Sequence, residues 1–158
     1  MITLVVARDR NGAIGKEGGI PWVAPEDLRM FQRETTGGAL IMGRRTWESL
    51  PVKPLKNRLN CVVSRDPEIA EHVFGDVASA VAFGYRQGYT RLYGIGGQGI
   101  YATLLSMTHR ILLTEVDLDV PGADAFFPVL EEAEWRETRR TILREDTPRC
   151  TLRELIRR

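Results

Sequence analysis

The chain has 158 residues, of which 43% are hydrophobic and 27% are charged. This composition excludes intrinsic disorder and fibrous architecture, and the length suits one domain, residues 1–158, with a large buried core. Twenty-two basic residues against 21 acidic ones leave a formal charge of +1, so no broad positive field is present to hold nucleic acid or an anionic membrane, and we expect neither as a partner.

Short apolar runs recur along the chain and predict buried strands. Residues 2–7 form an unbroken apolar run rather than an alternation, which is typical of a strand covered on both faces in a mostly parallel sheet. Similar runs predict further strands at residues 39–42, 59–63, 91–95 and 111–116. Helical patterns fall between most of these strands, so the sequence predicts an α/β fold.

Start and stop signals place the helices. Pro25 suits a first helical position, and Gly37-Gly38 mark the end of that helix. Asp76 is a good cap for the helix that follows it. The other helices are predicted at residues 44–50, 77–85 and 100–105.

The pattern changes after Pro128. Residues 135–143 and 150–156, separated by Asp146-Thr147-Pro148, predict an antiparallel hairpin at one edge of the sheet. The two cysteines, Cys61 and Cys150, are too few for a disulfide framework and are expected to be small core residues. The amino-terminal segment lacks the basic region and long apolar stretch of a secretion signal, so we expect a cytoplasmic protein.

A glycine-rich segment follows the first strand. Residues 12–19 contain four glycines, and Pro21-Trp22 follow immediately. Glycines make this backbone easy to rearrange, and Trp22 places a large ring beyond the carboxyl end of the first strand. Two interpretations stay open, namely a mobile lid and an ordinary surface loop with a packed tryptophan.

Asp27 is the only acid on the apolar face of the first helix, which it shares with Ala24, Leu28 and Phe31. Burial beside Leu28 and Phe31 would raise the pKa of this carboxyl, so that it could hold or relay a proton near neutral pH. Alternatively, an acid at the third helical position satisfies free backbone amides and the helix dipole. Glu26 is expected on the solvent side, where it already supplies negative charge for that purpose.

Two basic clusters follow neighbouring strands. Arg44-Arg45 open a helix directly after one strand, and Ser64-Arg65 end the next. In a parallel sheet the carboxyl ends of these strands would bring the clusters together, where a phosphate group binds well. The alternative is two solvated pairs of arginines.

The segment from Gly94 to Gly99 fits G-x-G-x-x-G between a strand and a helix, and Glu115 or Asp117 lies near the distance of a ribose-binding acid. A Rossmann-type site is disfavoured because four predicted strands precede this fingerprint. The adjacent Gly96-Gly97 pair is a candidate for unusual peptide geometry. His72 and His109 are too isolated for a metal site, so we expect them to be structural and expect no metal.

Taken together, seven motifs resemble the dihydrofolate reductase family in its bacterial chromosomal form. Their order and spacing cover the chain from residue 1 to Phe127-Pro128. The motifs are Ile14-Gly15, Pro21-Trp22, Pro25-x-Asp27-Leu28-x-x-Phe31, Ile41-Met-Gly-Arg-x-Thr-Trp47, Arg58-x-Asn60, Ser64-Arg65 and Ile95-Gly-Gly-x-x-Ile-Tyr101.

The resemblance implies a single α/β domain with a central eight-stranded, mostly parallel sheet, an antiparallel C-terminal strand and about four flanking helices. It also implies hydride transfer from NADPH to C6 of 7,8-dihydrofolate with protonation of N5, which gives tetrahydrofolate. Antifolates are the implied inhibitors, and the protein is expected to act as a monomer.

The resemblance further implies a substrate site centred on Asp27, which would pair with the pterin's amino group and ring nitrogen and act in catalysis with Trp22 and Tyr101. Arg58 would bind the α-carboxylate of the glutamate tail, with Lys53 as an outer partner and Thr114 beside the pterin. The remaining walls are apolar and are formed by Val5, Ala7, Leu28, Phe31, Leu50 and Leu55.

The implied NADPH site combines basic residues for the 2′-phosphate with a glycine-rich backbone for the diphosphate and nicotinamide. Its basic and hydroxyl residues are Arg44, Arg45, Thr46, Ser64 and Arg65. Its backbone and apolar residues are Ala7, Ile14, Ile20, Gly43, Ile95, Gly96, Gly97, Gln98, Gly99, Ile100 and Tyr101. Two other functions stay open at this point, a Rossmann-type NAD-dependent oxidoreductase and a non-catalytic pterin- or nucleotide-binding module.

Overall fold

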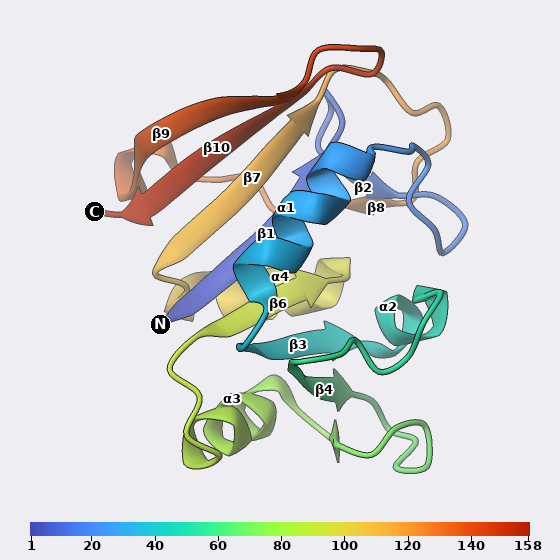
Figure 1. Ribbon diagram of the computed structural model, residues 1–158, viewed down its shortest axis with the longest axis vertical. Helices are drawn as coiled ribbons and strands as arrows, with labels where there is room; N and C mark the ends of the chain where they lie inside the picture. Colours follow the sequence, from blue (N-terminus) through green and yellow to red (C-terminus); the bar gives the residue numbers. More distant parts are fainter.

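A computed structural model describes residues 1–158 and contains an eight-stranded central sheet with the order β5-β4-β3-β6-β1-β7-β10-β9 (Figure 1). All neighbouring pairs are parallel except those of β10, which is antiparallel to both β7 and β9. This confirms the expected mostly parallel sheet with an antiparallel C-terminal strand. The strands are β1 (Ile2–Arg8), β3 (Ala39–Gly43), β4 (Leu59–Val63), β5 (Val73–Phe74), β6 (Leu92–Gly96), β7 (Arg110–Val116), β9 (Trp135–Arg144) and β10 (Cys150–Arg157).

Three short strands were not predicted from the sequence. Besides β5, these are β2 (Ala13–Gly15) and β8 (Ala125–Phe126), which pair antiparallel in a separate two-stranded sheet. Segments of two or three residues are too short to show a periodicity of their own. Each is stabilised by pairing with a partner that the local sequence does not reveal.

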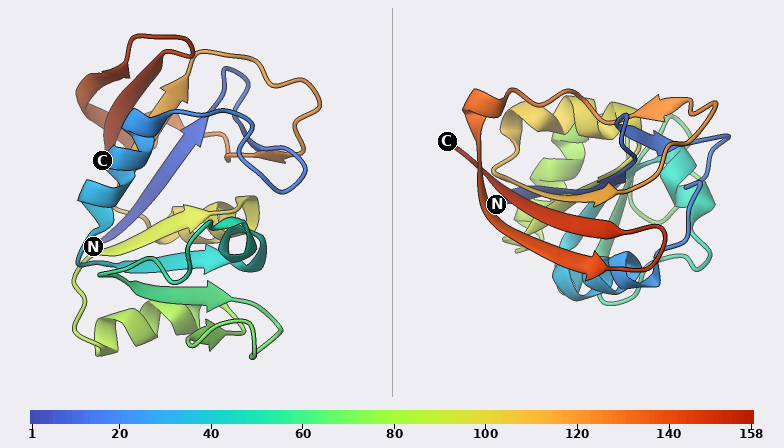
Figure 2. Two further views of the ribbon diagram at one scale, coloured as in Figure 1. Left: turned by 45° about the vertical axis from the view of Figure 1, so that its right-hand side comes forward. Right: turned by 90° about the horizontal axis from the view of Figure 1, so that it is seen from above.

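Helices cover both faces of the sheet. The right-hand view of Figure 2 shows α1 on one side of the sheet and α3 and α4 on the other. The predicted cap of α3 is confirmed, since the Asp76 side chain accepts a hydrogen bond from the Ser79 amide. The helices are α1 (Pro25–Thr35), α2 (Arg44–Ser49), α3 (Val77–Arg86) and α4 (Gln98–Leu104), followed by short 3₁₀ turns at Leu105–Met107 and Glu132–Glu134.

The helix α4 starts two residues before the predicted position. Gly97 is its N-cap, and the Gly97 carbonyl accepts a hydrogen bond from the Tyr101 amide. The sequence alone left Gln98 and Gly99 in the preceding glycine-rich loop because glycine is a poor helix former. None of the helices combines the length and apolar character needed to cross a membrane.

The unbroken apolar run of β1 serves two cores. Leu4 and Val6 belong to the core under α3 and α4, whereas Val5 belongs to the core under α1 with Met30 and Leu112. Each such side chain stabilises the fold by about 1.5–3 kcal/mol through burial. Cys61 and Cys150 are buried and free, as expected, and burial raises the pKa of the Cys61 thiol to about 12.

Candidate active site

The carboxylate of Asp27 lies in the first turn of α1 and contacts the middle strands of the sheet. Its Oδ1 accepts a hydrogen bond of 2.7 Å from the hydroxyl of Thr114, a fully buried residue of β7. No salt bridge of the chain involves Asp27. Burial raises the pKa of Asp27 above its usual range, and the Thr114 hydrogen bond offsets part of that rise. The site therefore holds a desolvated acid with a neutral partner.

Asp27 does not serve the helix terminus. Its side chain bonds to Thr114 and to no backbone amide, and α1 has no side-chain cap. The expectation that Glu26 simply faces solvent is wrong, because its carboxylate accepts hydrogen bonds of 3.1 and 3.2 Å from Arg144. Its own backbone amide and Arg144 lower the pKa of Glu26. Of these two adjacent acids, Glu26 fills the structural role, which leaves Asp27 without one.

Tyr101 lies close to this acid from the opposite side of β1. Its hydroxyl donates a 2.7 Å hydrogen bond to the carbonyl of Val5, and its ring packs edge-on against Phe127. Burial, together with the negative charge of Asp27, raises the pKa of Tyr101 well above its usual value. Tyr101 therefore remains a neutral phenol and fixes the backbone of β1 next to the site.

Glycines at the ends of β3 and β6 permit a close approach of α2 and α4 to these strand ends. A Cβ on Gly96 would lie 3.4 Å from both the Thr46 hydroxyl of α2 and the Tyr101 hydroxyl of α4. A Cβ on Gly43 would lie 3.5 Å from Ile100. The Gly96-Gly97 peptide bond is cis, in line with the unusual geometry expected there. The structure thus brings the predicted backbone cradle together.

Most of the apolar residues predicted to lie near Asp27 pack together, but Leu28 does not. Val5, Met30, Trp47 and Leu112 are buried in the core under α1, and half-buried side chains pack against them, namely Phe31, Leu50, Leu55 and Ile95. The prediction that Leu28 is buried is wrong, because 60% of it is exposed. Met30 instead anchors α1 on the sheet. Leu28 lies outside that contact, while Ala24 is buried as expected.

The segment before Asp27 is mostly exposed apolar surface. Trp22 and Ala7 pack against the small core of Ala24, Val116 and Cys150. Ile20 and Val23, in contrast, are 64% and 75% exposed. Trp22 thus contacts the protein beside Asp27, whereas Ile20 does not enter a core.

Arg58 is positioned by the end of α1. Its Nη1 donates to the Thr35 hydroxyl at 3.1 Å, its Nε donates to the Lys56 carbonyl at 2.9 Å, and its guanidinium lies 6.0 Å from the centroid of the Phe31 ring. Burial lowers the pKa of Arg58 from its very high usual value, and no carboxylate of the chain pairs with it. Lys53, five residues earlier in the sequence, is exposed. Arg58 therefore keeps donors for an external carboxylate.

Asn60 is a supporting residue to which sequence reasoning gave no role. It is 7% exposed, and its side-chain oxygen accepts from the Leu55 amide. Its side-chain nitrogen donates to the carbonyls of Leu55 and Arg58. Asn60 thereby fixes the backbone that presents both of those residues. The signal is a buried polar side chain near the start of β4, and its burial is visible only in the structure.

The two basic clusters meet as predicted. The register of β3 and β4 pairs Gly43 with Val63, so Arg44 and Ser64 follow at adjacent strand ends. Arg45 and Arg65 are exposed and form no ion pair, whereas Arg44 pairs with Glu48 at 3.2 Å within α2. The Ser64 hydroxyl accepts from the Asp66 amide. Two uncommitted guanidinium groups therefore lie at the carboxyl edge of the sheet.

The Rossmann interpretation fails on its key residues. A Cβ on Gly94 would lie 2.6 Å from Leu104 and 2.7 Å from Leu4, so this glycine is required for packing. Glu115 accepts hydrogen bonds from Arg8 and Arg153, and Asp117 pairs with Arg10. Both acids proposed for a ribose are thus engaged within the protein.

The glycine-rich segment is tied to the loop after β7. The buried carboxylate of Asp9 accepts from the amides of Asn11, Ala13 and Val120, each at 2.8 Å. The Glu17 amide donates to Asp124, and Gln98 accepts from the Phe126 amide. Ile14 lies in β2, which these contacts hold against β8. Sequence reasoning missed Asp9, whose role depends on a contact 111 residues away.

The two histidines have structural contacts. His109 Nδ1 accepts from the Ile2 amide at 2.9 Å, and the His72 ring lies 5.2 Å from the Phe83 ring. No group of three His, Cys, Asp or Glu side chains is placed to hold a metal ion.

Comparisons with known proteins agree on one family. A sequence model of the family described as "Dihydrofolate reductase" matches residues 1–155. The dihydrofolate reductase of Neisseria gonorrhoeae is 43% identical over 141 residues, which cover 89% of this chain and 86% of the relative. That of Mycobacterium tuberculosis H37Rv is 38% identical over 152 residues, which cover 88% and 91%.

The solved structures agree as well. Dihydrofolate reductase from Enterococcus faecalis, in complex with NADP(H) and the compound RAB-propyl, superimposes with a TM-score of 0.87 at 27% sequence identity. The match covers 99% of this chain and 96% of the Enterococcus chain.

Proposed function

Since this chain belongs to the dihydrofolate reductase family and reduces 7,8-dihydrofolate to 5,6,7,8-tetrahydrofolate with NADPH, we propose that Asp27 is the acid that binds the pterin and promotes protonation of N5. The observation that carries this assignment is the buried carboxylate with Thr114 as its only side-chain partner. Antifolates that present the same amino and ring-nitrogen donors bind to the same acid.

Asp27 is suited to both parts of this role. As a carboxylate it accepts two hydrogen bonds from the amino group and ring nitrogen of the pterin, and charge-assisted bonds of this kind are strong. Because burial raises its pKa, it also holds a proton nearer to neutral pH than an exposed aspartate does. Thr114 keeps one carboxylate oxygen in place for both tasks.

The rest of the substrate lies along the apolar residues beside α1 and ends at Arg58. Walls for the ring systems come from Val5, Ala7, Leu28, Phe31, Leu50 and Leu55. Arg58 binds the α-carboxylate of the glutamate tail, which supplies the partner that it lacks within the chain, and Lys53 is a weaker outer contact. Trp22 positions water near the pterin, since its indole nitrogen has no acceptor in the protein.

The residues at the carboxyl edge of β3, β4 and β6 fit NADPH. Gly96 and Gly97 leave space beside Thr46 that a Cβ would fill, and Arg45 and Arg65 offer free guanidinium groups for the 2′-phosphate. When bound there, NADPH supplies the hydride that reduces C6. Arg44 and Ser64 complete the phosphate contacts, and the diphosphate and nicotinamide lie against Ala7, Ile14, Ile20, Gly43, Ile95, Gln98, Gly99, Ile100 and Tyr101.

A cytoplasmic location and a monomeric state complete the proposal. Two free, buried thiols support a reducing compartment. The substrate and cofactor residues all come from one chain, so activity needs no second copy.

Loss of NADPH absorbance on addition of dihydrofolate tests the proposal, with and without a tight antifolate. We expect oxidation that requires dihydrofolate, stops with the antifolate and is at least tenfold slower with NADH, since two charge-assisted contacts to the 2′-phosphate contribute about 1.5–3 kcal/mol each. Equal turnover with NADH would contradict the role of the arginines. Binding of dihydrofolate without NADPH oxidation would instead favour a non-catalytic binding module.

A further inference from the structure

A cavity of about 510 Å³ lies on the face of the sheet opposite to Asp27. Residues alternate between the faces of a strand, so Thr114 of β7 points to Asp27 while Glu115 points to the other face. The volume is in the range of small-molecule sites. Its charged, polar and glycine lining residues are Arg8, Arg10, Asn11, Gly12, Glu132, Glu137, Arg153 and Arg158, and its apolar ones are Phe127, Val129, Leu130, Trp135 and Leu155.

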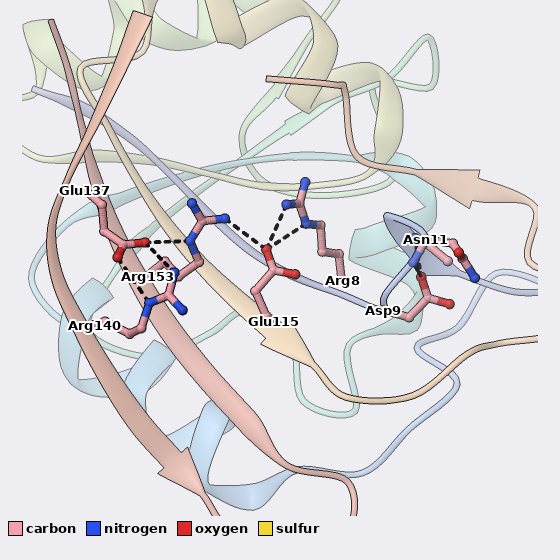
Figure 3. Close-up of polar contacts among 8 residues, drawn as sticks. Arg8, Asp9, Asn11, Glu115, Glu137, Arg140 and Arg153 are labelled. Carbon is pink, nitrogen blue, oxygen red and sulfur yellow. Dashed lines mark hydrogen bonds and ion pairs between the residues drawn. The ribbon is translucent and has the colours of Figure 1, made fainter. Parts of the chain in front are cut away.

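Arg8, Arg153 and Glu137 on the polar wall of this cavity belong to a chain of charges that continues outside the cavity through Glu115 and Arg140 and has an excess of cations. Glu115 Oε1 accepts from Arg8 at 2.8 Å and from Arg153 at 3.3 Å. Glu137 Oε1 in turn accepts from Arg153 at 2.6 Å and from Arg140 at 3.1 Å. Figure 3 shows this order, with Arg8 and Arg153 on either side of Glu115. Three guanidinium groups are therefore shared by two carboxylates.

Two donors on this wall are uncommitted. Arg8 uses Nε and Nη2 for Glu115, and Arg153 uses Nε and Nη1 for its two carboxylates, so Arg8 Nη1 and Arg153 Nη2 have no acceptor in the protein. Both side chains line the cavity and are only 21% and 22% exposed. Their positions are fixed by the carboxylates, so little entropy is lost when an anion binds.

The other wall is apolar. Phe127, Trp135 and Leu155 present the edge of the core, and Leu130 packs against them. Val129 is 90% exposed at the rim. A flat apolar body fits this wall, and an anion on that body reaches the two free guanidinium donors.

We propose that this cavity is a binding site for a small aromatic carboxylate. A carboxylate has two oxygens to match the free donors of Arg8 and Arg153, and its ring covers apolar surface between Phe127 and Trp135. Inorganic phosphate fits less well, since it needs more donors than these two and leaves the apolar wall exposed to water. None of the residues that line this cavity is among those assigned to the pterin or to NADPH.

The test is a titration of the ¹⁵N-labelled protein with 2-naphthoate, followed by NMR. We expect the Trp135 indole signal and the Gly12 and Phe127 amide signals to shift together and saturate at submillimolar ligand. The uncharged 2-naphthamide should bind at least tenfold more weakly. Saturable shifts of the same size with the amide, or shifts confined to Trp22 and Trp47, would overturn the proposal.

Single substitutions test whether naphthoate binding requires the charges of Arg8 and Arg153. Arg153→Gln should weaken naphthoate binding at least tenfold, as should Arg8→Gln if the first variant folds poorly. The matched control is Arg139→Gln, which removes the same charge from β9 beside Glu154 on the other face of the sheet. Binding that is equally affected by R139Q, or unaffected by both cavity variants, would show only general attraction to cations and would refute the site.

Discussion

The two faces of the sheet hold carboxylates in two opposite environments. On the face of α1, Thr114 contacts Asp27, whose only side-chain partner is that neutral hydroxyl. On the other face, Glu115 and Glu137 each contact two guanidinium groups. The pKa of Asp27 is raised by burial, whereas hydrogen bonds from Arg140 and Arg153 lower the pKa of Glu137.

This difference matches the proposed division between Asp27, as an acid that exchanges a proton, and acids that stabilise the fold. A carboxylate paired with arginine stays ionised and stabilises the native state. A carboxylate that is desolvated beside a hydroxyl keeps its proton to higher pH and is available to a substrate. Replacing the desolvated acid Asp27 should reduce catalysis, whereas replacing an arginine-paired acid such as Glu115 should reduce stability.

The largest effect is expected for Asp27→Asn. The amide cannot supply a proton or the charge that orients the pterin, so kcat/KM at neutral pH should fall about 100-fold or more. Activity should recover in part at low pH, where solvent protonates N5. Steady-state kinetics across pH measure this, and a variant with a nearly wild-type rate at neutral pH would remove Asp27 from the mechanism.

A smaller loss is expected for Thr114→Val, which keeps the volume and removes the hydroxyl. The Thr114 hydrogen bond lowers the pKa of Asp27, so its loss should move the pH profile of kcat/KM toward higher pH. The rate should fall about tenfold because one carboxylate oxygen is no longer held. An unchanged profile would show that Thr114 does not influence the proton on Asp27.

Glu115→Gln is expected to reduce stability and to leave activity nearly unchanged. The amide leaves Arg8 and Arg153 without their shared charge, which should cost about 1 to 2 kcal/mol of unfolding free energy at these half-buried positions. The kcat/KM should stay within about twofold of the wild type, because Glu115 faces away from Asp27. Denaturant unfolding and the NADPH assay on one preparation measure both. A large loss of activity without loss of stability would contradict a purely structural role for Glu115.

The smallest effects concern the pH dependence of unfolding and have opposite signs. The pKa of Asp27 is raised in the folded state, so protonated Asp27 favours the folded state at low pH. This contribution is lost as pH rises through the folded pKa. Asp27→Asn should therefore melt a few degrees above the wild type at neutral pH, with the gap closing in acid. The folded pKa of Glu137 is lowered, so its contribution is lost as pH falls. Glu137→Gln should melt slightly lower at neutral pH and match the wild type in acid.

The parts of this comparison that follow sequence periodicity were predictable. Three features depend on local patterns and on the geometry of parallel strands, namely the apolar run of β1, the position of Asp27 on α1, and the adjacent strand ends that Arg44 and Ser64 follow. The family resemblance then gave the candidate residues their expected roles. Local pattern and motif thus reach most of the sheet and the identity of the candidate acid.

The remainder depends on contacts between residues distant in sequence. Glu26 meets Arg144 across 118 residues, and Asp9 meets Val120 across 111, so neither role has a local signal. Leu28 shares the helical face of Ala24, but it lies beyond the sheet surface that Met30 covers and is exposed. Periodicity alone does not show where the sheet surface ends. The chain of ion pairs around Glu115 joins four strands, β1, β7, β10 and β9, and so depends on their alignment in the sheet.

Direct titration of the Asp27 carboxyl carbon by ¹³C NMR, with the signal assigned through its absence in D27N, tests the central claim. We expect a midpoint above the usual value of an exposed aspartate, while the Glu137 carboxyl titrates below the usual value of glutamate. A midpoint for Asp27 at or below the usual value would contradict it.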